Sequence, residues 1–157
     1  MKQFITNTIL SLFILLFSNC NSSNASEEAV KQNNMLVTKL NSIKLDIVEF
    51  DEGANIRDAV QFFRQRAREL DTPNTPPALD PNIKPIEMVT PEAETQKISI
   101  NIYNVTLMEA IAKVAKTAKV DAYVTSHGVR IVSKGTNPIP KNRDDVKVVY
   151  IIHKNSN

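Results

Sequence analysis

Two helical patterns, each preceded and followed by strand-like segments, constrain the fold of this chain more than any other feature of its sequence. In the first, Asn55 can cap the free amides of a helix, and apolar residues then recur at steps of three and four. These residues are Ile56, Ala59, Val60, Phe63, Ala67 and Leu70. In the second, Thr106 and Glu109 have the spacing of a capping box. Its apolar stripe consists of Leu107, Ala110, Ile111, Val114, Ala115 and Ala118. Each helix therefore has one face to bury in a core.

Strand-like segments surround both helices. Residues 43–50 alternate apolar and polar side chains, with a change of parity at Val48 that a β-bulge in this strand would produce. The other strand patterns cover residues 83–89, 97–103, 122–125, 129–132 and 146–152. Pro85 restricts the first of these to a sheet edge or a strand start, and Gly128 can supply the positive φ of a tight hairpin turn. The order predicts an α+β fold, a small β-α-β-β-α-β(-β) sandwich of two helices on a mixed sheet.

The amino terminus has the pattern of an export signal. Residues 9–17 form an apolar run that has the length of a signal peptide and is too short to span a bilayer. Two processing sites compete after it: residues 17–20 resemble a lipobox, which would make Cys20 a lipidated first residue, and residues 23–25 fit ordinary signal peptidase. We favour Cys20, because it directly follows the apolar run and precedes a polar stretch. The expected location is the cell envelope, either periplasmic or as an outer-membrane lipoprotein.

These patterns divide the chain into four parts. They are a signal peptide over residues 1–25, a tether with a short helical lead-in over 26–42, an α+β domain over 43–133, and a linker with a C-terminal strand over 134–157. Cys20 is the only cysteine, so the exported domain contains no disulfide and depends on its core for stability.

Composition and motifs argue against several classes of function. A net charge of +2 and a pI near 8.7 are well short of a typical nucleic-acid-binding domain. The strand at 97–103 exposes Ser99 and Asn101 instead of aromatic rings that could stack on RNA bases. The sequence has no phosphate-binding glycine loop or nucleophile motif, and neither His127 nor His153 has a second ligand at metal-binding spacing. We therefore expect no enzyme activity, cofactor, metal or nucleic-acid partner.

The first helix carries a group of arginines whose meaning the sequence leaves open. Arg57, Arg64 and Arg68 fall on one flank of it, and Arg66 falls on the other. A solvated helix face explains these charges without any function. Alternatively, the three arginines form a surface that docks onto an acidic envelope protein, or onto an anionic envelope polymer or lipid head group.

The sequence resembles a known family over roughly residues 40–133. The resemblance rests on a strand ending in Glu49-Phe50, the helix over residues 56–71, the strand-to-helix junction over 102–111, and the closing hairpin over 123–132. Together these segments are similar to the secretin and TonB short N-terminal domain. The resemblance implies a small periplasmic α+β module that acts through its surfaces, and a partner in a secretion or TonB-type system. The chain departs from the family pattern in its proline-rich segment after Asp71, and it ends about two dozen residues after the resemblance, which leaves no room for a channel or barrel.

Overall fold

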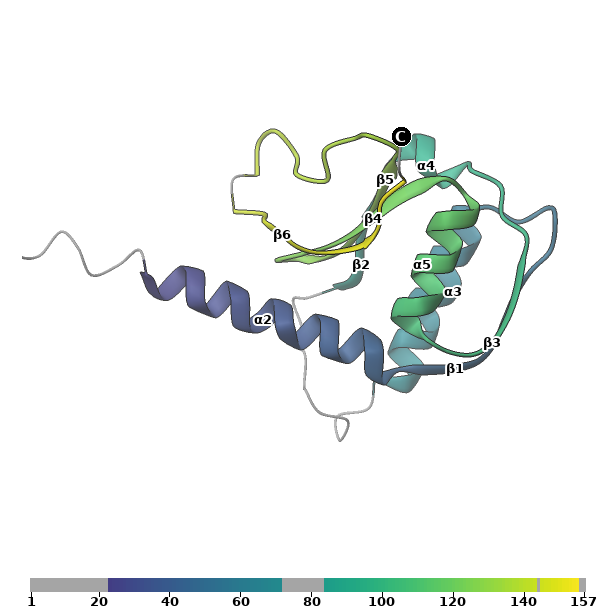
Figure 1. Cartoon of the computed structure of the whole chain (residues 1–157), viewed down its shortest axis with the longest axis horizontal. Coiled ribbons are helices and arrows are strands. Elements are labelled where there is room, and N and C mark those ends of the chain that lie inside the picture. Colours follow the sequence, from purple (N-terminus) through teal and green to yellow (C-terminus); the bar gives the residue numbers. More distant parts are fainter. Residues whose placement is uncertain (1–22, 72–83, 144, 156–157) are drawn as a thin grey trace, which may run out of the picture.

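The computed structural model of this chain describes residues 23–71, 84–143 and 145–155 (Figure 1), so Cys20 and most of the proline-rich segment lie outside the described residues. Four helices and six strands lie within the described part. They are α2 (Ser23–Ser42), β1 (Lys44–Phe50), α3 (Ile56–Leu70), β2 (Lys84–Val89), α4 (Pro91–Glu94), β3 (Ile100–Thr106), α5 (Leu107–Thr117), β4 (Val120–Thr125), β5 (Gly128–Ser133) and β6 (Val148–His153).

The strands divide into two sheets, with α3 and α5 between them (Figure 1). One is an antiparallel ribbon of β1 and β3, and the other has the order β2-β5-β4-β6. In the larger sheet β2 runs parallel to β5 while the other neighbours are antiparallel, so this sheet is mixed. The predicted α+β class and the mixed sheet are confirmed. The structure has two sheets where the sequence predicted one, because β1 and β3 pair with each other and not with a strand of the larger sheet.

Both predicted helices form where their patterns place them. Asn55 caps α3 and forms a capping box with Asp58, and Thr106 and Glu109 form the expected box at the start of α5. All six stripe residues of α5 are buried, as are five of the six in α3. The exception is Leu70, which is 40% exposed because α3 ends there, so its assignment to the core was wrong.

The β1–β3 ribbon changes its inward face without a bulge. The pairing keeps one register from Lys44 opposite Thr106 to Phe50 opposite Ile100. Instead, both strands turn two successive residues outward at the same level: residues 46–47 in β1 and residues 103–104 in β3. Asn104 has a φ of 52°, a left-handed conformation that asparagine tolerates better than most residues. The parity change predicted at Val48 is therefore present, but the one-strand bulge predicted to cause it was wrong.

One helix takes the place of the predicted tether. Helix α2 runs from Ser23 to Ser42, and its C-terminal half packs against α5 and β4. Leu36 and Leu40 are buried there, one turn apart. Lys39 lies between them, fully buried, with its ammonium group paired with the carboxylate of Asp71 at the end of α3. These contacts make the second half of α2 part of the domain core.

The C-terminal segment also belongs to the domain. Strand β6 pairs with β4. The buried carboxylate of Asp121 on β4 binds the chain just after β5 and just after β6. Its Oδ2 accepts a hydrogen bond from the Gly135 amide at 3.0 Å, and its Oδ1 accepts one from the Asn155 amide at 2.8 Å. Strand β2, with Pro85 as its second residue, lies at the opposite edge of the sheet, as its sequence predicted.

Candidate functional site

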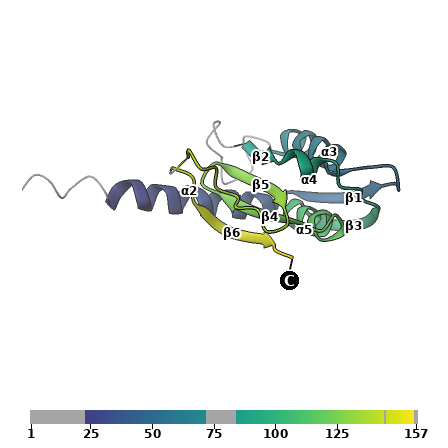
Figure 2. The ribbon, with the colours of Figure 1, turned by 90° about the horizontal axis from the view of Figure 1, so that it is seen from above.

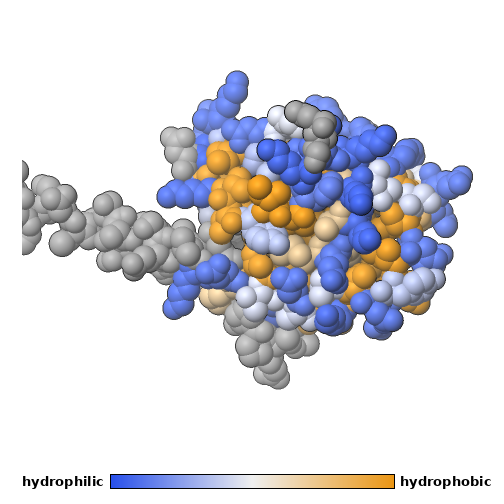
Figure 3. Space-filling model, viewed as in Figure 1, coloured by the Kyte–Doolittle hydropathy of each residue, from blue (hydrophilic) through white to orange (hydrophobic). Residues whose placement is uncertain are grey.

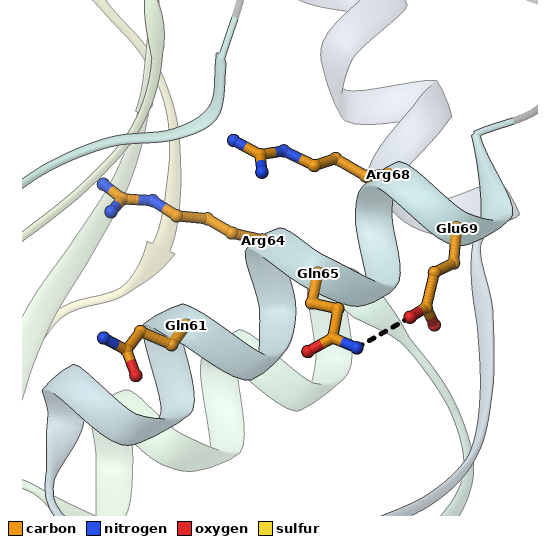
Figure 4. A pocket seen from close by; sticks show the side chains of 5 residues that line it. All are labelled: Gln61, Arg64, Gln65, Arg68 and Glu69. Carbon is orange, nitrogen blue, oxygen red and sulfur yellow. Dashed lines mark hydrogen bonds between the residues drawn. The ribbon is translucent and has the colours of Figure 1, made fainter.

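A hollow of about 440 Å³ lies on the outer surface of α3 (Figure 4). Five described residues line it: Gln61, Arg64, Gln65, Arg68 and Glu69. They share one side of α3 because helical residues three and four positions apart are neighbours. We call this surface the arginine hollow. Figure 4 shows the Arg64 and Arg68 side chains extending in the same direction from successive turns.

The two arginines of the hollow are held differently. The half-buried Arg64 donates to the carbonyl oxygen of Ile86 in β2, from Nε at 3.2 Å and from Nη2 at 3.1 Å. This contact fixes the plane of the guanidinium group and leaves the Nη1 N–H groups for another acceptor. Arg68 is exposed, and among the described residues no hydrogen bond or ion pair joins it. The hollow thus combines Arg64, whose guanidinium group is held in one orientation, with Arg68, whose side chain can change its conformation.

Glu69 is the carboxylate at the rim of the hollow, and its contacts lie on the side away from the two arginines. It accepts hydrogen bonds from Gln65 at 2.8 Å and from Arg66 at 2.9 Å (Figure 4 draws the first). The Gln65 hydrogen bond, together with the hydrogen bond and charge of Arg66, lowers the pKa of Glu69 below 4.5. Arg66 also lies over the Phe62 ring, 5.5 Å from its centroid, which keeps it on the other flank of α3 as the sequence predicted.

Arg57 lies outside the hollow and has a partner of its own. Its Nη2 donates to Oε2 of Glu94 at 2.7 Å, and its Nε donates to the same oxygen at 3.2 Å. The hydrogen bond and the charge of Glu94 raise the pKa of Arg57. Glu94 belongs to α4, a one-turn helix that our reading of the sequence missed although Pro91 at its first position is a common start signal. The structure therefore brings together two of the three arginines on the predicted flank.

The arginine hollow is suited to binding anions. Guanidinium groups supply N–H donors in a planar fork that fits a carboxylate or a phosphate, and the amide groups of Gln61 and Gln65 can add donors or acceptors. The chemistry that this hollow offers is recognition of negative charge.

A second polar cluster, which the sequence analysis missed, fastens the β4–β5 turn. The Ser126 hydroxyl lies 3.0 Å from Nδ1 of His127, and Nε2 of His127 lies 3.1 Å from Oδ2 of Asp145. Arg143 donates two hydrogen bonds to the Asp145 carboxylate, which is the main reason that the pKa of Asp145 is lowered. Ser126 also donates to the Asp145 carbonyl and accepts from the Lys147 amide. The contacts of His127 with Asp145 and of Ser126 with Asp145 and Lys147 connect the turn to the segment before β6, which gives the cluster a structural role.

Two further observations limit the kinds of site in the described residues. No group of three histidine, cysteine, aspartate or glutamate side chains in this part of the chain could hold a metal ion. None of the described helices combines the length and the apolar character needed to cross a membrane.

No family model matches the chain, and no curated protein or solved structure matches it either.

Proposed function

We propose that this chain is a non-enzymatic interaction module of the cell envelope, an accessory of a secretion or transport system that binds an acidic envelope protein through the arginine hollow. The observation that carries the proposal is the pair of guanidinium groups, Arg64 and Arg68, that extend into one hollow. The apolar run over residues 9–17 and the lipobox-like Cys20 support export and anchoring by a lipid.

The electrostatics of α3 favour an acidic partner. Arg64 and Arg68 are four positions apart on a helix, a spacing at which like charges repel each other. A partner carboxylate between them would remove this repulsion and form charge-assisted hydrogen bonds with both side chains. Because the Ile86 carbonyl already orients Arg64, less side-chain entropy is lost when the partner binds.

The resemblance to the secretin and TonB short N-terminal domain supports the same proposal. The resemblance rests on the strand, helix, strand-to-helix junction and hairpin patterns within roughly residues 40–133. That family acts through protein surfaces, which agrees with a hollow that offers binding groups. The proposed partner is therefore an envelope protein of a secretion or TonB-type system.

The experiment compares two double variants. Arg64→Gln with Arg68→Gln removes both cations of the hollow, and Arg57→Gln with Lys113→Gln removes two exposed cations outside it. We expect the first variant to lose at least about 100-fold in affinity for the partner, because each charged hydrogen bond contributes about 1.5–3 kcal/mol. The control variant should bind as the wild type does.

The partner would be identified by crosslinking in cells from a photoreactive residue at position 61, followed by mass spectrometry. Unchanged crosslinks in the hollow variant at low salt would contradict the proposal and leave the arginines as a solvated face. If the hollow variant instead lost retention on anionic vesicles or anionic polysaccharide, while its protein crosslinks persisted, the hollow would bind an anionic head group or polymer.

A further inference from the structure

Strand β6 is the outer edge of the four-stranded sheet. Figure 2 shows it at one side of the sheet, with β2 at the other. On its inner side β6 pairs with β4, and within the described part of the chain no strand pairs with its outer side. An edge strand of this kind presents a row of free backbone N–H and C=O groups, to which an extended segment can add.

The side chains of β6 are unusually apolar for an exposed edge. Val148, Tyr150 and Ile151 are 37%, 49% and 51% exposed, whereas all six residues of the neighbouring β4 are buried. Figure 3 shows an apolar area on this face of the molecule, over β6. Edge strands commonly carry charged residues or proline that prevent pairing. The six residues of β6 contain neither proline nor a lysine, arginine, aspartate or glutamate.

The charges near β6 lie at its two ends. Lys147 precedes the strand and Lys154 follows it, and both are exposed. In an antiparallel pair of two β6 strands, directly opposite residues point to the same face of the sheet, so Lys147 of one copy would lie near Lys154 of the other, one position out of register and on the opposite face. These two like charges at each end of the pair would repel each other, which disfavours pairing between two copies. The same lysines would attract a segment that carries carboxylates at both ends.

We propose that the outer edge of β6 binds an extended segment of another protein, with apolar side chains in its middle and acidic residues at both ends. Backbone hydrogen bonds supply the pairing, Val148, Tyr150 and Ile151 supply apolar contacts, and the two lysines select the acidic ends. This surface is distinct from the arginine hollow, whose Arg64 contacts β2 at the opposite edge of the sheet. It does not depend on the function proposed for the hollow.

The test uses a pool of synthetic peptides of about eight residues, close to the length of a strand. Valine, isoleucine, threonine and tyrosine vary at the middle positions, and each end carries glutamate; a matched pool carries lysine there. We expect the purified protein to bind the glutamate pool about tenfold more tightly, by fluorescence anisotropy, because two end pairs each contribute up to about 1 kcal/mol. Bound peptide should also slow hydrogen exchange of the β6 amides.

The decisive variant is Lys147→Glu with Lys154→Glu, which should reverse the preference so that the lysine pool binds more tightly. The control is Lys113→Glu with Lys116→Glu, the same charge change on the exposed side of α5, which should keep the wild-type preference. The proposal is overturned if neither pool binds, if both variants prefer the same pool, or if exchange slows elsewhere. Dimers that protect the β6 amides without peptide would also overturn it, since a second copy would then be the occupant.

Discussion

Replacing Asp121 by asparagine should detach the C-terminal segment from the rest of the domain. The Asp121 side chain is almost the same size as asparagine and is 1% exposed, so Asp121→Asn removes a charge and one acceptor oxygen without opening a cavity. The carboxylate receives amide hydrogen bonds on both oxygens, from Gly135 at 3.0 Å and from Asn155 at 2.8 Å. The Asn155 side-chain amide adds a third at 3.3 Å.

The expected loss of stability follows from these bonds. Hydrogen bonds to a charged acceptor contribute about 1.5–3 kcal/mol each, and those to a neutral acceptor about 0.5–1.5 kcal/mol. The single side-chain oxygen of asparagine can accept the hydrogen bonds of either Gly135 or Asn155. Its NH₂ group then faces the other backbone N–H group, which loses its acceptor. We therefore expect Asp121→Asn to lower the free energy of unfolding by about 2–4 kcal/mol at pH 7.

The pH dependence gives an independent check. Burial raises the pKa of Asp121, but the amide hydrogen bonds from Asn155 and Gly135 outweigh it and hold the pKa below its ordinary value of 3.8. A depressed folded-state pKa contributes stability that is complete above pH 3.8 and is lost as the pH falls through the folded value. The variant lacks this group, so the difference in stability between wild type and variant should shrink below pH 3.8.

The measurement is urea unfolding of both proteins between pH 7 and pH 3, with hydrogen exchange to locate the change. Exchange should accelerate at Gly135 and Asn155 and along β6. Asp46→Asn, the same substitution at an exposed position of β1, is the control and should change stability by less than about 0.5 kcal/mol. A difference between Asp121→Asn and wild type that stayed constant down to pH 3 would show that the charge of Asp121 does not hold the segment.

Two further predictions concern the core and the amino terminus. Val114 is fully buried in α5, so Val114→Asp should cost several kcal/mol and prevent folding, while Lys116→Asp on the exposed side should shift stability by less than about 0.5 kcal/mol; similar melting of the two would contradict the packing of α5. Fatty-acid labelling in cells should succeed for the wild type and fail for Cys20→Ala, and a mature protein that begins at Ser26 would exclude the lipid anchor.

The sequence predicted the elements whose signals are local. The capping residues Asn55 and Thr106, the two apolar stripes and the glycine of the β4–β5 turn each act within a few positions, and all except Leu70 have the predicted role. Gly128, for example, has the positive φ of 141° that the turn was expected to require. Local hydrogen bonds and helical spacing can be recognised without any knowledge of the fold.

The rest depended on contacts between distant parts of the chain. The separation of β1 and β3 from the larger sheet follows from a pairing that joins residues far apart in the sequence, such as Lys44 and Thr106. Similarly, the sequence of α3 has no acidic residue three or four positions from Arg57. The partner of Arg57 is Glu94, which is 37 positions away in the chain. The resulting candidate site therefore contains two of the three arginines that the helix pattern suggested.

Helix α2 would determine how a membrane anchor presents this domain. Its 20 residues rise about 30 Å, and its buried end is fixed to the core through Leu36 and Leu40. A flexible linker of equal length would allow free rotation at a mean distance of about 25 Å. If Cys20 is lipidated, α2 would instead link the distance of the domain from the membrane to its rotation about the helix axis. Inserting two residues into α2 would raise the domain by only about 3 Å but turn its binding surfaces by about 200° around the helix axis.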